Sequence, residues 1–133
     1  MRHRNILLLV ANGAHARILR RDAESGELHT VVRLEDGPAA RDGHAPYTPD
    51  QRSTRSEAYA KVILAQVADV LRQHPAEGVI VSAPAHLMHA LHEPLGHLCK
   101  VIASTQKDLV KLADHDLKAQ LASELNHADL GFA

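Results

Sequence analysis

Aliphatic runs and alternating apolar positions divide the first part of the chain into short strands. Residues 5–10 are almost entirely aliphatic and lead to the turn pair Asn12 and Gly13, after which residues 14–20 continue with side chains compatible with a strand. Past a second turn, residues 28–34 alternate with a spacing of two, which predicts that four side chains share one face of a third strand. These four are Leu28, Thr30, Val32 and Leu34. The opening therefore predicts an antiparallel meander of three strands.

A polar segment separates this meander from the first predicted helix. Residues 36–53 are rich in Gly, Pro, Asp and His and have no apolar period, which predicts an exposed loop. Thr54 and Glu57 then have the spacing of a capping box, and apolar residues recur at helical spacing from Tyr59 towards Pro75. The pattern predicts a helix that begins at Thr54 and ends before Pro75.

The second half of the chain alternates predicted strands with predicted helices. Residues 78–83 form an aliphatic run bounded by Gly and Pro, which is typical of a strand buried on both faces. A helix over residues 85–92 is expected to end near Pro94, and residues 98–103 indicate a fifth strand. Three leucines spaced four apart predict a last helix with Asp114 as its N-cap.

This order of elements predicts the fold class and the position of a binding site. It favours a single α/β domain over residues 1–133, with three layers and a mixed five-stranded sheet. Right-handed crossovers would make strands one, four and five parallel, so that their carboxyl ends meet at one edge, the usual ligand crevice of open α/β sheets. The candidate ligand-binding residues at this edge are Asn12, Gly13, Arg17, Ser82, Lys107 and Asp108.

The predicted crevice suits an anion. The backbone N–H groups at the start of the helix after Pro84 could hold a negative group, with Arg17 or Lys107 as the charge partner. The alternative interpretation is that the Asn-Gly pair is only a turn and the segment ending at Pro84 only a strand-to-helix junction.

Composition narrows the classes of function. The 133 residues suffice for one core and 45% are hydrophobic, but one Phe, two Tyr and no Trp leave few side chains for stacking on bases. A net charge of −1 gives no general attraction to nucleic acid or to an acidic membrane. Cys99 is the single cysteine, which excludes an internal disulfide, and no early apolar stretch has the length of a signal peptide or a membrane span. We therefore expect a cytoplasmic protein without a membrane partner.

Two local clusters carry alternative hypotheses. Basic residues near the start and along the second strand could contact RNA phosphates, the candidates being Arg2, Arg4, Arg20 and Arg21. Histidines in the middle of the chain are weak candidates for a metal site, namely His86, His89 and His97. Because HExxH is absent and Cys99 has no Cys or His partner at finger spacing, a solvated histidine-rich face is the preferred interpretation and no metal is expected. GxGxxG, GxxxxGK[ST] and GxSxG are absent as well.

Three phrases, taken in order, resemble one family. LLVANGAHARIL, VIVSAPAHLMHAL and KDLVKLADHDLKAQL are similar to phrases of the bacterial host-attachment proteins, a family described as required for attachment to host cells. The similarity spans nearly the whole chain. His15 stands where the family more often has Arg, and residues 82–87 lack a proline and an arginine of the family's usual middle phrase.

The resemblance implies a fold and a function. The family is similar in fold to the middle domain of the archaeal and eukaryotic peptide-chain release factor, a relative of ribonuclease-H-like folds. Residues 36–51 contain no Gly-Gly-Gln tip, and residues 5–10 and 78–83 contain no carboxylate for two-metal chemistry. We therefore expect a non-enzymatic binding or regulatory protein of this family, without a cofactor, whose partner is an unknown protein or a small molecule. The alternatives are an RNA- or ribosome-associated translation factor without hydrolytic activity and a metal-dependent hydrolase built on the histidines.

Overall fold

The computed structural model describes residues 4–35 and 49–130, and it describes the side chains of the first helix from Glu57 onward. The elements are β1 (Ile6–Ala11), β2 (Ala16–Arg21), β3 (Leu28–Leu34), α2 (Pro49–Gln73), β4 (Gly78–Ser82), α3 (Ala85–Leu98), β5 (Lys100–Thr105), α4 (Asp114–Gln120) and α5 (Ala122–Asp129).

The five strands form one mixed sheet in the order β3-β2-β1-β4-β5. β1 pairs in parallel with β4, and β4 with β5, whereas β2 is antiparallel to both of its neighbours. The predicted α/β class, opening meander and parallel set of strands are therefore confirmed. β1 lies at the centre because its aliphatic residues can be buried on both faces.

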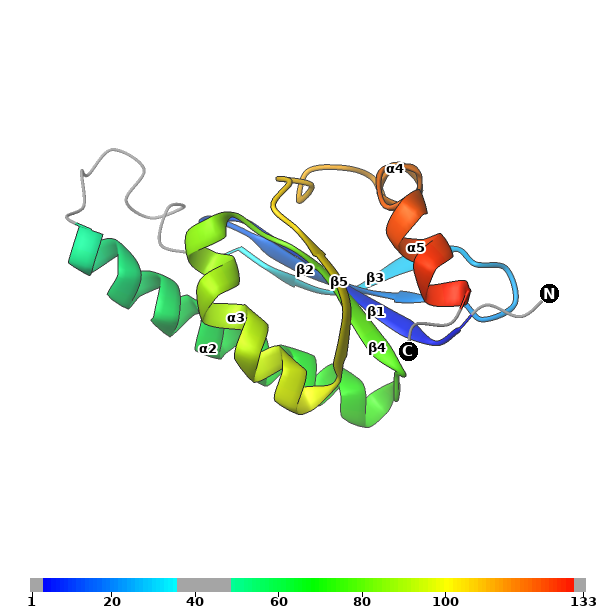
Figure 1. Cartoon of the computed structure of the whole chain (residues 1–133), viewed down its shortest axis with the longest axis horizontal. Helices are drawn as coiled ribbons and strands as arrows, with labels where there is room; N and C mark the ends of the chain where they lie inside the picture. Colours follow the sequence, from blue (N-terminus) through cyan, green and yellow to red (C-terminus); the bar gives the residue numbers. More distant parts are fainter. Residues whose placement is uncertain (1–3, 36–48, 131–133) are drawn as a thin grey trace.

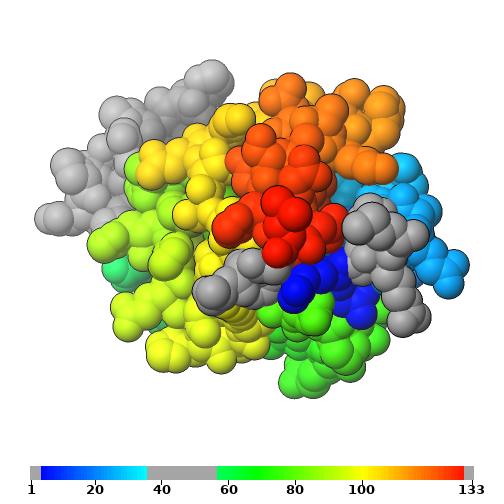
Figure 2. All heavy atoms as spheres, turned by 45° about the vertical axis from the view of Figure 1, so that its right-hand side comes forward, coloured from blue at the N-terminus to red at the C-terminus, as the bar shows by residue number. Residues whose placement is uncertain are grey.

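Helices cover both faces of the sheet and create two cores (Figure 1). α2 and α3 cover one face, where Leu7 and Leu9 of β1 are fully buried. α4 and α5 cover the other face and bury Leu8 and Val10. Figure 2 shows the last two helices, orange to red, forming the surface on their side of the molecule. The result is the predicted three-layer arrangement.

One extra residue changes the register of β3. Val31 lies between the two stretches of β3 that pair regularly with β2, and such a bulge reverses the face to which the following side chains point. Leu28 accordingly belongs to the core beneath α4 and α5, whereas Val32 and Leu34 pack against the core beneath α2 and α3. The prediction that the alternating residues of this strand share one face is wrong.

β5 contains a similar extra residue, and a glycine on the neighbouring strand makes room for it. Ile102 is left between the residues that pair with Val79 and Ile80 of β4. A Cβ atom on Gly78 would come within 2.5 Å of the Ile102 side chain and 3.0 Å of the carbonyl oxygen of Lys100. Gly78 is therefore required by close packing.

We expect Gly78→Ala to lower the free energy of unfolding by about 1–3 kcal/mol, because the new methyl group overpacks a buried site. Urea denaturation followed by circular dichroism measures the change. The matched control is Gly96→Ala in α3, where a new Cβ atom meets nothing within 4 Å. That change should raise stability by up to about 1 kcal/mol, since alanine is the better helix former. Equal effects of the two substitutions would contradict the packing role.

The first two helices extend beyond their predicted ends. α2 begins at Pro49, so residues 49–53 are helical rather than part of the predicted loop, and Thr54 lies inside the helix instead of capping it. Proline is favoured at a first helical position, which accounts for the earlier start. Residues 36–48 of the predicted loop lie outside the described residues. α3 continues through Pro94 to Leu98 because Leu91 and Leu95 are fully buried and hold the helix against the core.

The last predicted helix is divided in two. Leu121 separates α4 from α5 with φ −107° and ψ 19°, yet the three leucines of the pattern are all buried in the same core. Ala113 occupies the N-cap position of α4. Asp114, the predicted cap, is the first helical residue, and its carboxylate accepts hydrogen bonds from β2 and β3 instead.

Candidate functional site

The structure brings most of the predicted site residues to one edge of the sheet. The side-chain amide of Asn12 donates to the carboxylate of Asp108 at 3.2 and 3.3 Å. The hydroxyl of Ser82 donates to the backbone oxygen of Lys107 at 2.6 Å. The ends of β1 and β4 and the segment after β5 are therefore adjacent, as predicted from the topology.

These contacts hold the loops together. The Asn12 side-chain oxygen accepts from the backbone N–H groups of Ala14 and His15, each at 2.8 Å, so it builds the turn between β1 and β2. Gly13 does not adopt a positive φ in this turn. Ser82 is buried, with its hydroxyl bound to Lys107. The polar atoms of Asn12 and Ser82 are therefore occupied within the protein, and their predicted role in ligand binding stays a prediction.

Arg17 fixes the segment between β5 and α4. It is 3% exposed, and its Nη1 atom donates to the backbone oxygens of Val110 and Leu112 at 2.8 and 2.5 Å. Its Nη2 atom donates to the hydroxyl of Thr30 at 3.1 Å and to the carboxylate of Asp114 at 2.5 Å. Both terminal nitrogens thus bind groups that lie far away in the sequence.

Arg17 also lies on the wrong face for the role predicted for it. It pairs with Val10, whose side chain belongs to the core beneath α4 and α5, whereas α3 covers the opposite face. The prediction that Arg17 assists an anion at the start of α3 is therefore wrong. Lys107 is exposed at the sheet edge and keeps its candidate status there.

Asp114 is held in its charged form. Partial burial alone would raise the pKa of its carboxyl, but two hydrogen bonds from Thr30 and the positive charge of Arg17 outweigh that effect and lower the pKa. The ion pair between Arg17 and Asp114 is therefore intact at neutral pH.

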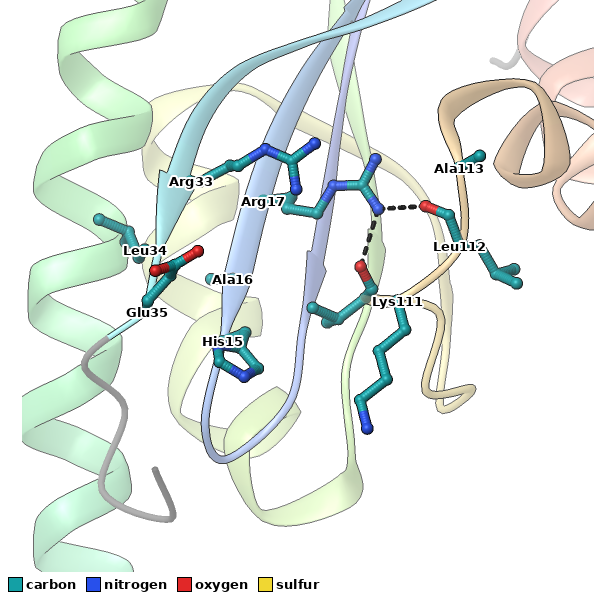
Figure 3. A pocket seen from close by; sticks show the side chains of 10 residues that line it. His15, Ala16, Arg17, Arg33, Leu34, Glu35, Lys111, Leu112 and Ala113 are labelled. Atoms are coloured by element: carbon teal, nitrogen blue, oxygen red, sulfur yellow. Dashed lines mark hydrogen bonds between the residues drawn. The ribbon is translucent and has the colours of Figure 1, made fainter. Parts of the chain in front are cut away.

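A pocket adjoins the Arg17 side chain. It has a volume of about 390 Å³ and lies between the start of β2, the end of β3 and the segment that joins β5 to α4. We call it the cationic pocket, and its lining residues are His15, Ala16, Arg17, Arg33, Leu34, Glu35, Val110, Lys111, Leu112 and Ala113. Figure 3 shows Arg17 and Arg33 side by side, with the His15 ring and the end of the Lys111 side chain below them in this view.

Positive charge dominates this pocket. Arg33 is the Cα partner of Arg17 on the neighbouring antiparallel strand, so the two side chains leave the sheet on the same face. Among the residues whose side chains are described, Arg33 makes no ion pair and Arg17 Nε is buried without a hydrogen-bond acceptor. Lys111 is exposed on the third wall, and Glu35 is the one acidic residue of the lining.

Sequence reasoning missed Arg33, Lys111 and His15 as site residues. Arg33 follows the extra residue of β3, and a bulge of this kind leaves no reliable mark in the sequence. Lys111 lies in the third phrase of the family resemblance, but its spacing gave no reason to place it near β2. Their common location becomes visible only in the folded chain.

Two of the predicted RNA-binding residues, Arg20 and Arg21, do not share a surface. Arg20 and Arg21 are neighbours in β2 and therefore point to opposite faces of the sheet. Arg20 is exposed, but Arg21 is 3% exposed and binds Asp129 of α5 at 2.5 Å and the backbone oxygen of Arg4 at 2.8 Å. Arg2 lies outside the described residues. The prediction that Arg21 contacts RNA is wrong because its guanidinium group is buried and paired.

The histidines of α3 do not converge on a metal site. His86 and His89 line a cavity of about 320 Å³ between α2 and α3, together with Glu57, Lys61 and Glu93. His97 does not line this cavity. Over residues 4–35 and 57–130, whose side chains the structure describes, no three His, Cys, Asp or Glu side chains are grouped so that they could hold a metal ion. The histidine-based alternative therefore lacks the ligand set that it requires.

Within residues 4–35 and 49–130, no helix has both the length and the apolar character that crossing a membrane requires.

Comparison with known proteins gives similarities of fold. No family model and no curated protein matches the chain. A Ppx/GppA phosphatase from Aquifex aeolicus matches with a TM-score of 0.48 and 10% identity, over 77% of this chain and 35% of that one. An exopolyphosphatase from Cytophaga hutchinsonii matches with a TM-score of 0.49 and 14% identity, over 76% and 33%. Thermus thermophilus RuvC matches with a TM-score of 0.44 and 13% identity, over 90% and 79%. The chain spans about a third of the length of the phosphatases that it matches.

These comparisons correct the functional prediction made from the sequence. We expected a non-enzymatic protein of the host-attachment family, but the similar structures named above include phosphatases, which are enzymes, and no host-attachment protein is among them. The non-enzymatic prediction and its non-hydrolytic RNA-associated alternative are therefore set aside. The hydrolase alternative fails on a different observation, the missing metal-ligand set among the described residues. The resemblance to the host-attachment family stays a prediction, and the activities of the similar structures are not assigned to this chain.

Proposed function

We propose that this protein binds a small anionic ligand in the cationic pocket. The observation that supports this function is the pair of arginines on adjacent strands. Arg17 is buried and has an Nε–H group without an acceptor among the described residues, and the exposed Arg33 lies directly opposite. Two guanidinium groups are thus brought together beside a cavity that a ligand can enter.

The arrangement is costly unless an anion is bound. Like charges directly opposite each other on neighbouring strands are destabilising. Asp114 compensates the charge of Arg17, but no described side chain forms an ion pair with Arg33. A buried N–H group without an acceptor costs a further ~1–3 kcal/mol. An oxyanion between the two guanidinium groups would offset both costs.

The location and size of the pocket also suit a small ligand. It opens at the same edge of the sheet as the carboxyl ends of β1, β4 and β5, where open α/β sheets commonly bind ligands. Its volume of about 390 Å³ falls within the ~300–1,000 Å³ range typical of small-molecule sites. The proposed site is therefore displaced from the predicted crevice towards β3.

Replacement of Arg33 tests the proposal. We expect the wild-type protein to bind inorganic phosphate or benzoate in low-salt buffer, and Arg33→Gln to weaken that binding by about tenfold or more, because a charge-assisted hydrogen bond is lost. Isothermal titration calorimetry measures the affinity. Arg20→Gln is the matched control, since it removes the same charge from an exposed position on the opposite face. Equal affinities of wild type and Arg33→Gln, or no binding of either anion at millimolar concentration, would refute the function.

The Nε–H group of Arg17 gives a second readout that needs no mutation. In a nitrogen-15 NMR spectrum of the arginine side chains, a buried Nε–H group is protected from exchange with water and gives its own signal. Addition of an oxyanion that binds in the cationic pocket should shift this signal. A shift confined to arginines other than Arg17 and Arg33 would place the anion elsewhere.

A further inference from the structure

We infer that the ligand carries two anionic groups: a phosphoryl group between Arg17 and Arg33 and a second acidic group held by Lys111 at the rim. This inference rests on the proposed anion site and specifies its ligand. It follows from the N–H donors of Arg17 and Arg33 that have no partner among the described residues and from the direction in which the Lys111 side chain extends in Figure 3.

The donors at the inner end match a phosphoryl group. The terminal nitrogens of Arg17 already bind four acceptors, which leaves its Nε–H as one donor of fixed direction. Arg33 can present two parallel N–H groups from the opposite residue. A planar carboxylate that accepts from both parallel N–H groups of Arg33 would have both of its oxygens at Arg33. A phosphoryl group has a third terminal oxygen for Arg17 Nε.

Two backbone oxygens of the pocket lining are already paired with Arg17. The carbonyl oxygens of Val110 and Leu112 accept from Arg17 at 2.8 and 2.5 Å. Figure 3 shows the Leu112 oxygen directed at the guanidinium group, while the Leu112 side chain points away from Arg17. The inner wall is therefore positively charged, with its acceptors already occupied.

A compact anion bound between the two arginines would leave Lys111, at the rim of the pocket, without a partner in the ligand. Figure 3 shows the Lys111 side chain extending away from the two guanidinium groups, towards the side of the pocket where the His15 ring lies. Glu35 projects from the end of β3 on the opposite wall and repels negative charge there. A second acidic group is thus favoured on the Lys111 side, which indicates an extended ligand such as a phosphorylated acid or a diphosphate.

Three small ligands distinguish the possibilities: ethyl phosphate, 2-phosphoglycolate and glycolate. We expect 2-phosphoglycolate to bind about fivefold more tightly than ethyl phosphate, the gain typical of one partly exposed ion pair, and glycolate to bind most weakly. In Lys111→Gln the affinity ratio of the two phosphates should fall to about one. Lys61→Gln, which removes an exposed lysine of α2 on the opposite face of the sheet, should leave this ratio unchanged. Calorimetry on the full chain gives each affinity, and thermal melting checks that each variant is folded.

The outcomes separate this inference from the proposed function. Equal binding of the two phosphates, or a ratio that survives Lys111→Gln, would overturn the second group while the anion site stands. Glycolate binding as tightly as ethyl phosphate would overturn the phosphoryl assignment. If no compound binds, or if Arg33→Gln does not weaken ethyl phosphate binding, both proposals fail.

Discussion

Arg17→Met is expected to lower the free energy of unfolding by about 3–5 kcal/mol, a large part of the ~5–15 kcal/mol that stabilises a typical domain. The substitution keeps much of the buried side-chain volume but removes the donors to Val110, Leu112 and Thr30. It also leaves the carboxylate of Asp114 without its cation. Urea denaturation followed by circular dichroism measures the loss.

Two further variants identify the cause of this loss. Arg20→Met removes an exposed arginine from the same strand and should change stability by less than about 0.5 kcal/mol. Arg17→Lys keeps the charge but cannot reproduce the fork of donors, so it should remain clearly less stable than wild type. If Arg17→Met lost less than about 1 kcal/mol, far below the usual cost of breaking a buried pair, Arg17 would not be the residue that fixes the segment before α4.

Arg21→Met should have the second largest effect, a loss of about 3 kcal/mol. The Arg21 side chain is 2% exposed and donates to the carboxylate of Asp129 in α5 and to the backbone oxygen of Arg4. It therefore joins β2, the start of the chain and the last helix. Arg21 binds the backbone oxygen of one residue, whereas Arg17 binds those of two, and water can solvate the 29% exposed Asp129 side chain after the change. The loss is therefore placed at the lower end of the usual range.

Hydrogen exchange locates the effect of Arg21→Met. The amides of α5 should lose more protection than those of α2, because α2 packs on the opposite face of the sheet. Asp129→Asn retains an acceptor and should lose less than half as much stability. Uniform loss of protection across both helices would contradict a local anchoring role for Arg21.

The sequence predicted the sheet well because most of its signals are local. β1 and β4 are aliphatic runs whose residues are all buried, and a strand covered on both faces needs no other pattern. The order of elements then placed the ends of the parallel strands together, and the contacts of Asn12 and Ser82 confirm that arrangement. The topology alone was therefore sufficient to predict that these residues lie at the same edge of the sheet.

Helix ends were predicted less well because several local signals compete and packing can outweigh them. The spacing of Thr54 and Glu57 fits a capping box, but α2 starts five residues earlier at a proline. Pro94 should end a helix, but it lies inside α3 between two fully buried leucines. In α3 the tertiary contacts of the two leucines outweigh the cost of the proline, whereas α2 begins at a different local signal, a proline at its first position.

The chemistry of the site could not be predicted because it depends on distant partners. Arg17 meets acceptors that follow it by 93 to 97 residues, and nothing in its neighbourhood distinguishes it from the exposed Arg20. The pairing of Arg17 with Arg33 further depends on the bulge at Val31. A basic residue in a strand therefore indicated charge but did not reveal whether that charge is buried or available to a ligand.

The extra residues in β3 and β5 have a consequence for association between copies of the chain. These strands are the two outer members of the sheet, and their outward peptide groups could template a strand from another molecule. Val31 and Ile102 interrupt the regular hydrogen-bond spacing within each of them. A strand from another molecule would meet irregularly spaced hydrogen-bonding groups at both edges of the sheet. The two bulges therefore protect the fold against uncontrolled addition of strands and fibril formation.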